Sequence, residues 1–508
     1  MTDTRSYRPL CLPMPSQSGL ILWAIVLAAG LALALLPLQW LVIAVPGTAF
    51  LLLTLVKPHL ALYLLCFAVP FGSLFEVDLG GITVGVTEGL VGIMIAAWIA
   101  RSIALREGRW TWPRLSAPLA LFVGAALISA INASGLTLFL KEIAKWLEFL
   151  GVMLFASSAI DRDQSRTVVA SALLAGAAQA LLGAYQFFTQ SGPESFVMMG
   201  RYMRAYGTFE QPNPYGGYLG LVAPVAFALA VSLLKRRGAP AAARSAVERR
   251  AQQPVPLWLQ GLAAASFALI GVAIGMSGSR GAWLAFGAGF GFMNVVRSRR
   301  GATTFITVVA VLALFGLLGS FRLLPEPAGR LVQTFGGRLT SFASSFSSRD
   351  VRGIEITDAN YASVERLAFW QAALDMWRDH PWLGIGFGNY QAAYVTYSLP
   401  KWPMSLGHAH NYYLNVAAEA GLIGLTTYLW LWGMAIWQMG RAFREAGDPY
   451  VRALALGALG MLVHISVHNV VDNLWVHSMY IHVAIILGLV YGRRGPAHSL
   501  THNRSRFA

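Results

Sequence analysis

The chain has 508 residues, of which 56% are apolar and only 12% are charged, whereas an ordinary soluble domain has about 25% charged residues. Its mean hydropathy is +0.56. These values exclude a soluble enzyme, a disordered chain and a coiled coil, and the long apolar runs exclude a membrane barrel, whose strands alternate. We attribute the excess of 38 Lys and Arg over 23 Asp and Glu to membrane topology, so no nucleic-acid partner is needed to explain it.

Fourteen apolar runs predict an all-α polytopic membrane protein with 12–14 transmembrane helices. The first two runs meet at Pro37 and form a tight hairpin or a re-entrant pair. We expect the first to be a retained span, because it lacks a small-residue cleavage site. The runs are 19–36, 38–56, 59–75, 82–100, 115–131, 141–160, 167–189, 214–234, 257–276, 281–296, 302–320, 412–438, 452–470 and 474–491.

The basic residues predict which loops face the cytoplasm. If both termini are cytoplasmic, most of the 38 Lys and Arg fall in short cytoplasmic segments, as the positive-inside rule requires. The long segment 321–411, the loop 190–213 and the turn Ser277–Gly281 then lie on the outer side. The two cysteines, Cys11 and Cys66, are too few for a disulfide framework, and we expect no bridge between them.

Three regions follow from this topology. Residues 1–320 carry transmembrane helices with short loops and a cytoplasmic linker at 235–256, which is rich in Ala, Arg and Pro. Residues 321–411, between the eleventh and twelfth runs, form a large loop on the outer side, which is the periplasmic side if the chain is bacterial, as the resemblance described below implies. Within it, 361–380 is an amphipathic helix with Leu367, Trp370, Leu374 and Trp377 on one face. Residues 412–508 hold the last helices and a cytoplasmic tail.

His410 is the candidate general base, because it stands where the outer loop becomes a helix. A histidine at a water-exposed helix mouth can accept a proton from a hydroxyl. Gly421 lies about three turns further along, on the same face, and we expect it to admit a neighbouring helix beneath the histidine. A histidine that only caps the helix end is the structural alternative.

Four arginines are candidate ligands for a polyanion. Arg280 lies in the small-residue turn Ser277–Gly281, Arg201 and Arg204 flank tyrosines, and Arg366 opens the amphipathic helix. Arginine favours two-pronged contacts with phosphate oxygens. The structural alternative is that these arginines snorkel to the membrane surface.

Two groups of charged or polar residues lie within predicted spans. Lys141, Lys145 and Glu148 share a helix face, where mutual pairing competes with a functional role. His464, His468 and Asp472 also share a face at four-residue steps. We favour a polar cavity lining there over a metal site, because the sequence has neither an HExxH motif nor a carboxylate cluster.

Together these elements resemble the O-antigen ligase and O-antigen polymerase superfamily of bacterial membrane glycosyltransferases, and they are closest in pattern to the ligases. The resemblance covers about residues 200–490 and rests on four motifs in order. They are Gly207-Thr-Phe-Glu-Gln-Pro-Asn213, Ser277-Gly-Ser-Arg-Gly-Ala-Trp283, Arg366-x-x-x-Trp370 leading to His380-Pro-Trp-Leu-Gly-Ile-Gly386, and His410-Asn411 followed by Glu419-x-Gly421.

The resemblance implies a metal-independent, cofactor-free, inverting transfer at the periplasmic face of the inner membrane. The donor is a glycan on undecaprenyl diphosphate, and the acceptor is lipid A–core or, in a polymerase, another lipid-linked glycan. His410 matches the proposed base and Arg280 and Arg366 match the diphosphate ligands, with Arg201 and Arg204 as further candidates. We assign supporting roles to Asn411, Glu419, Lys145 and Asp472.

Two other functions remain open. A polymerase of O-antigen, exopolysaccharide or capsule carries a similar His-Asn element. A flippase or other transporter of lipid-linked oligosaccharides is the alternative outside the enzymes, but it favours paired halves and a central charged path. This chain has no evident internal repeat, and its His and Arg candidates lie at one predicted surface.

Overall fold

The computed structural model describes residues 38–74, 76–78, 83–106, 110–198, 200–232, 254–321, 323–326, 329, 350–357 and 360–492. The predicted run 19–36, Cys11 and most of the linker 235–256 lie outside these residues. Each of the other thirteen runs coincides with a helix. These helices are α2 (Leu38–Val56), α3 (His59–Phe71), α4 (Val86–Ala104), α5 (Ser116–Ile128), α6 (Leu136–Ser158), α7 (Arg162–Thr189), α8 (Pro212–Ala230), α10 (Leu257–Met276), α11 (Arg280–Arg297), α12 (Arg299–Ser320), α16 (Tyr412–Glu445), α17 (Pro449–His468) and α18 (Met479–Tyr491).

The chain is a multi-pass membrane protein. Six of the described helices are long and apolar enough to cross a membrane, and four further apolar helices are shorter. The six are Val86–Ala104, Arg162–Thr189, Leu257–Met276, Arg299–Gly319, Tyr412–Glu445 and Pro449–His468. A total of 12–14 spans remains a prediction, because the shorter helices need tilt or local bilayer thinning to cross.

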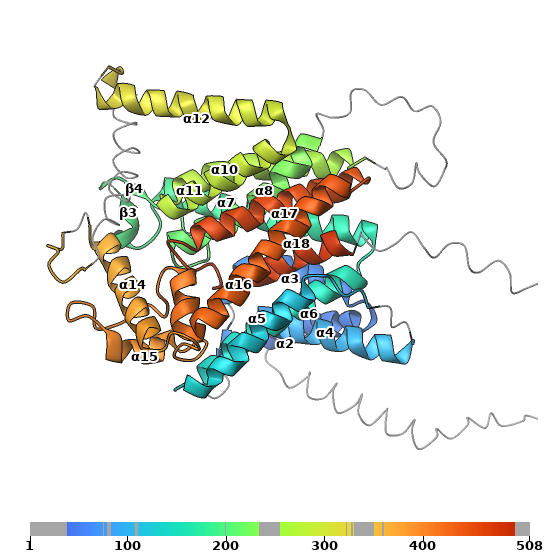
Figure 1. Cartoon of the computed structure of the whole chain (residues 1–508). Coiled ribbons are helices and arrows are strands. Elements are labelled where there is room, and N and C mark those ends of the chain that lie inside the picture. The colour runs from blue at the N-terminus through green and yellow to red at the C-terminus, as the bar shows by residue number, and fades with distance from the viewer. Residues whose placement is uncertain are drawn as a thin grey trace, which may run out of the picture. The chain divides into compact units, whose positions relative to one another are not determined.

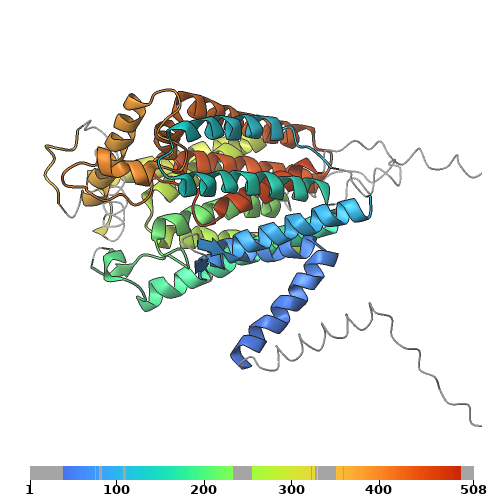
Figure 2. The ribbon, with the colours of Figure 1, turned by 90° about the horizontal axis from the view of Figure 1, so that it is seen from below.

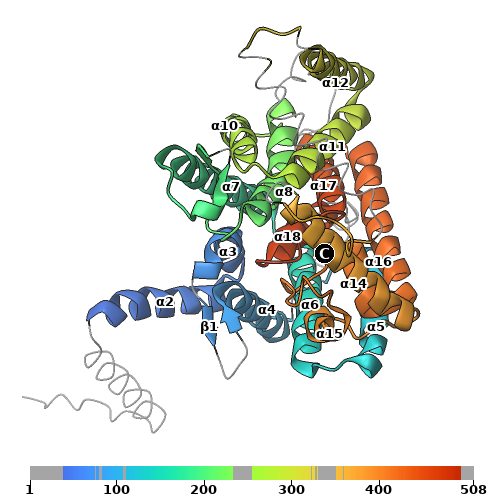
Figure 3. The same cartoon turned by 90° about the vertical axis from the view of Figure 1, so that its left-hand side faces the viewer.

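Residue contacts divide the chain into two units, Met1–Lys57, which contains α2, and Pro58–Ala508. In the second unit, α17 packs against α8, α11 and α16, α18 packs against α6, and α10 packs against α7 and α8. These helices run side by side (Figures 1 and 2). One end of the bundle is covered by α14 (Tyr361–Asp379) and α15 (Tyr390–Tyr397), which face the viewer in Figure 3.

Two short hairpins were not expected from the apolar pattern. β1 (Glu76–Asp78) pairs antiparallel with β2 (Thr83–Gly85), and β3 (Val197–Met198) pairs with β4 (Tyr202–Met203). Short 3₁₀ turns, Gly72–Leu74, Ser129–Asn132 and Glu194–Phe196, follow α3, α5 and α7. They leave the fold almost entirely helical.

Helix α14 agrees with the amphipathic helix predicted at 361–380, but its buried face differs from the prediction. Phe369, Ala372, Ala373 and Met376 form a core with residues of α15, whereas Leu367 is the one buried member of the predicted stripe. Trp370 and Trp377 lie at the edges of this core and not inside it, because their indole N–H groups donate hydrogen bonds there. Trp370, for example, donates to the His410 carbonyl at 3.3 Å.

Gly421 admits a turn rather than the helix that we predicted. Its φ of 65° and ψ of −165° break α16, and a Cβ there would lie 2.2 Å from the Trp382 carbonyl carbon. Glycine is essentially the residue that adopts this backbone region. The turn 381–386 fills the break, and the Leu422 amide donates to the Pro381 carbonyl at 2.8 Å. The kink therefore fixes the loop before α15 against α16.

Candidate active site

His410 lies just before α16 in a left-handed backbone conformation with φ of 50°. Non-glycine residues adopt this region rarely, and strained residues cluster at functional sites. The surrounding chain holds it in place. The Asn411 side chain caps α16 by accepting from the Tyr413 and Leu414 amides at 3.1 Å each, and the Asn415 side chain accepts from the Ala409 amide at 3.0 Å.

The loop between α17 and α18 brings Asp472 to His410. Helix α17 ends at His468, and the Tyr412 amide donates to the Asn469 carbonyl at 2.8 Å, which ties the start of α16 to this loop. The His410 Nδ1 and Asp472 Oδ1 atoms are 3.1 Å apart, and both side chains are about nine-tenths buried. The two residues therefore form a buried hydrogen-bonded pair.

This pair fixes the chemistry of the imidazole. A carboxylate accepts only, so the proton on His410 lies at Nδ1 and leaves the lone pair at Nε2. Nε2 is buried and has no hydrogen-bond partner among the described residues. An imidazole held in this way can accept a proton at Nε2, while the carboxylate fixes the orientation of the ring.

Asp472 stays ionised in this setting. Burial alone would raise the pKa of the Asp472 carboxyl, but the hydrogen bond from His410 and the electrostatic interactions with His410, Arg366 and His468 outweigh burial and hold the pKa below its ordinary range. The same carboxylate oxygen also accepts the Asn473 amide at 2.9 Å.

His468 lies near the other carboxylate oxygen, with 4.0 Å between Nε2 and Oδ2. The predicted single face of His464, His468 and Asp472 is therefore wrong in detail, because the helix ends before Asp472. The helix predicted for 474–491 also starts later than expected. Helix α18 begins at Met479, after His477 and Ser478, which have left-handed backbone angles.

His408 is the second histidine of the site. Its ring centroid is 4.3 Å from that of His410, and its Nδ1 accepts the His410 backbone amide at 3.1 Å. Burial, with a smaller effect of His410, lowers the pKa of His408 to about 3, so this ring stays neutral. His408 is thus an acceptor that positions the His410 backbone.

The ligand atoms of His408, His410 and Asp472 all lie within 4.8 Å of one another, so among the described residues these three form a group that could hold a metal ion. Two imidazoles and a carboxylate suit zinc or a similar cation. Binding through Nδ1 of His410 would require loss of its hydrogen bond to Asp472. Metal-independent chemistry remains a prediction for this site.

Helix α14 adds two charged residues beside this pair. Arg366 is close enough to act electrostatically on Asp472, and its Nε is buried without a hydrogen-bond partner among the described residues. Glu365, which the sequence analysis missed, interacts with both His410 and Arg366, and burial raises its pKa. The one feature of the sequence that pointed to Glu365 is its position next to Arg366.

The other predicted arginines occupy different positions. The residue after Arg280, Gly281, lies so close to the Asp472 loop that a Cβ would be 2.8 Å from Val471 and 3.6 Å from His468 Nε2. Arg204 instead donates to the Ser277 carbonyl at 2.8 Å and to Asn213 at 3.1 Å, which braces the same turn. Arg201 is exposed in the β3–β4 hairpin, 5.4 Å from the Tyr202 ring.

The remaining supporting residues are structural in their contacts. The Glu419 carboxylate accepts the Tyr390 amide at 2.9 Å and so anchors the start of α15. Lys145 pairs with Glu142 at 2.6 Å, not with the predicted Glu148, whose carboxylate accepts from Tyr480. These contacts hold the helices around the site.

The comparison with known families agrees with the motifs. A family model described as O-antigen ligase matches residues 265–429, which include Arg280, Arg366 and His410. No curated protein matches the chain. The match confirms the resemblance to the O-antigen ligase superfamily over this third of the chain.

Proposed function

We propose that the chain, with its O-antigen ligase region at 265–429, is an inverting, metal-independent glycosyltransferase of the bacterial inner membrane. It moves a glycan from undecaprenyl diphosphate to a hydroxyl of lipid A–core. The site faces the periplasm and both termini are cytoplasmic, as the distribution of arginines favours. The observation that carries the proposal is the Asp472–His410 pair, in which the His410 Nε2 has no hydrogen-bond partner among the described residues and Arg366 acts electrostatically on Asp472.

His410 acts as the general base in this reaction. Its Nε2 takes the proton of the acceptor hydroxyl while that oxygen bonds to the anomeric carbon of the donor sugar. The bond from this carbon to the diphosphate oxygen breaks on the opposite face, so the configuration inverts. Asp472 stabilises the imidazolium that forms, through the hydrogen bond to Nδ1.

The arginines stabilise the leaving group. The departing undecaprenyl diphosphate gains negative charge, and arginine donors fixed in a partly buried site stabilise such charge without a metal. The unpartnered Nε of Arg366 and its electrostatic effect on Asp472 support this role. We expect Arg280 to join it from the turn beside Val471.

A second enzymatic function uses the same site. If the acceptor is another lipid-linked glycan, the chemistry is unchanged and the product is a polymer. A flippase is less consistent with these contacts. The unpartnered Nε2 of His410 and the Arg366 side chain belong to one end of the bundle and do not form a path along it.

The test gives the purified full chain a lipid-linked glycan, either with lipid A–core or with no second acceptor, and measures the size of the products. One glycan added to lipid A–core supports ligation, and a ladder without lipid A–core identifies a polymerase. Translocation of labelled donor across proteoliposomes with no covalent product would contradict both enzyme assignments.

A further inference from the structure

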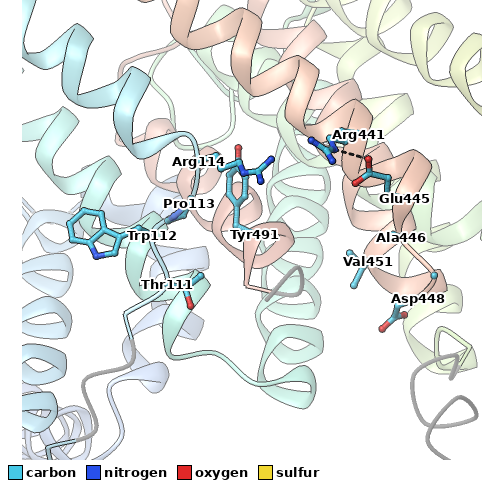
Figure 4. Close-up of a pocket in the computed structure, with 11 residues that line it drawn as sticks. Thr111, Trp112, Pro113, Arg114, Arg441, Glu445, Ala446, Asp448, Val451 and Tyr491 are labelled. Atoms are coloured by element: carbon cyan, nitrogen blue, oxygen red, sulfur yellow. Dashed lines mark hydrogen bonds and ion pairs between the residues drawn. The ribbon is translucent and has the colours of Figure 1, made fainter. Parts of the chain in front are cut away.

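The opposite end of α16 and α17 from His410 contains two cavities, one on each side of the turn that joins these helices. The larger one is about 490 Å³ and contacts the loop before α5 and the end of α18, as Figure 4 shows. The smaller one is about 210 Å³ and lies among the ends of α8, α11 and α16 and the start of α17. Ala446 and Gly447 line both cavities.

The acidic residues of the larger cavity are already neutralised by arginines. Arg441 pairs with Glu445 at 2.6 Å on one wall, as the dashed line in Figure 4 marks. Asp448 pairs with Arg162 at 2.9 Å. The larger cavity therefore has a mixed wall in which most charges are satisfied within the protein.

The smaller cavity differs in having two arginines over an apolar floor. Its floor includes the buried side chains of Ala228, Phe443 and Leu456. Arg297 in the last turn of α11 and Arg452 in the first turn of α17 also line it. In the part of the chain that the structure describes, neither arginine has an ion pair with a carboxylate.

Aromatic rings hold both guanidinium groups in place. The Arg297 Cζ lies 5.9 Å from the centre of the Phe227 ring, and the Arg452 Cζ lies 4.9 Å from that of Phe443. A guanidinium on an aromatic face keeps its N–H edges available for an anion, and it is well suited to phosphate oxygens. The two arginines thus present positive charge beside an apolar floor.

We propose that this cavity binds an anionic phospholipid of the leaflet at this end of the bundle. The phosphate contacts Arg297 and Arg452, and the first part of an acyl chain lies on the apolar floor. A cavity of about 210 Å³ is smaller than the roughly 300–1,000 Å³ of pockets that enclose a whole small molecule, so it takes part of a lipid. Charge complementarity favours this occupant: two arginines line the cavity, and the proposed orientation, on which this inference rests, puts this end of the bundle in the negatively charged cytoplasmic leaflet.

The proposal has a structural consequence that is independent of the reaction. The lipid contacts α8, α11, α16 and α17 at once, and α16 and α17 carry the His410 site at their other ends. A bound anionic lipid therefore stabilises the central helices of the bundle. The ligand binds the folded state, so it raises the unfolding temperature.

The experiment measures the unfolding temperature of the delipidated full chain in neutral detergent. Phosphatidylglycerol is added in one arm, phosphatidylcholine with the same acyl chains in the second, and inorganic phosphate in the third. We expect phosphatidylglycerol at saturation to raise the unfolding temperature by at least about 2 °C more than phosphatidylcholine, and phosphate to have no effect.

Variants assign the effect to the cavity. Arg297→Gln with Arg452→Gln should remove the difference between the two lipids, and each single variant should reduce it. Arg441→Gln is the matched control, because Arg441 also lies over an aromatic ring, Trp437 at 5.9 Å, but lines the other cavity. Ala453→Leu fills the apolar floor and should weaken the lipid effect while both arginines remain.

Three results would overturn the proposal. Equal shifts with both lipids would mean that headgroup charge is not recognised. A full phosphatidylglycerol effect in the double variant would place the lipid elsewhere. A shift with inorganic phosphate alone that matches that of phosphatidylglycerol would identify a simple anion site. If the double variant does not fold, the two single variants decide in the same way.

Discussion

Asp472→Asn separates the charge of Asp472 from its hydrogen bond to His410. The Oδ1 atom accepts both the His410 Nδ1–H, with 3.1 Å between Nδ1 and Oδ1, and the Asn473 amide at 2.9 Å. The backbone amide needs an acceptor, so the amide oxygen of the new side chain should occupy the same place. The proton on His410 then stays at Nδ1, and the variant loses only the negative charge.

The size of the effect follows from that loss. A hydrogen bond to a charged group contributes about 1.5–3 kcal/mol and a neutral one about 0.5–1.5 kcal/mol, so loss of the charge alone removes about 1–1.5 kcal/mol. About 1.36 kcal/mol corresponds to a tenfold change in rate, and we therefore expect the transfer rate of Asp472→Asn to fall roughly 5- to 13-fold. Asp472→Ala removes the acceptor as well, and its loss should approach the 10²–10⁴-fold typical of a missing general base.

The assay is the single-turnover rate of glycan transfer at saturating donor, with the unfolding temperature measured for each variant. Asp375→Asn is the control, because Asp375 forms an exposed ion pair with Arg378 at 2.8 Å on α14. This variant should leave the transfer rate unchanged. A normal rate for Asp472→Asn would refute a role for the charge. A loss as large as that of a His410 deletion would mean that Asp472 itself takes part in proton transfer.

Three further predictions concern the kink, the arginines and the metal. Gly421→Ala should destabilise the protein by about 2–6 kcal/mol, the sum of backbone strain and overpacking, whereas Gly433→Ala in open space on α16 should be close to neutral in a thermal unfolding assay. Arg280→Lys and Arg366→Lys should each impair transfer, and the double alanine variant should lose less than the sum of the single losses if both contact one diphosphate. Full function with lysine and simple additivity would instead identify membrane anchors. Transfer should survive EDTA, and loss on chelation with rescue by one divalent ion would assign a metal to His408, His410 and Asp472.

The apolar runs predicted the helices because a membrane-spanning helix records its environment locally, in consecutive residues. Breaks in the helices were harder to predict. The run 474–491 continues in apolar character through Leu474 and Trp475, which are buried although they lie in a loop. Hydropathy reports burial and does not report backbone angles, so the late start of α18 was missed.

The sequence singled out His410, Arg366 and Asp472 separately, but it did not predict that the His410 and Asp472 side chains pair. His410 and Arg366 follow from position and motif, whereas the Asp472–His410 contact joins residues 62 positions apart. The sequence grouped Asp472 with His468 because the two are four residues apart in an apolar run that was expected to be one helix. Helix α17 ends at His468, and the loop that follows carries Asp472 to His410. Glu419 and Arg204, which the sequence analysis also assigned to the site, form hydrogen bonds to the backbone that the sequence did not predict.

The most direct test of the central claim is the single-turnover transfer rate of His410→Ala, compared with that of His408→Ala. The two rings lie side by side, yet of the two only His410 pairs with Asp472, and its Nε2 has no hydrogen-bond partner among the described residues. We predict that His410→Ala is inserted, folded and slower by roughly 10²–10⁴-fold, with His408→Ala much less affected. A near-normal rate in folded His410→Ala, with the loss in His408→Ala instead, would contradict the assignment of His410 as the base.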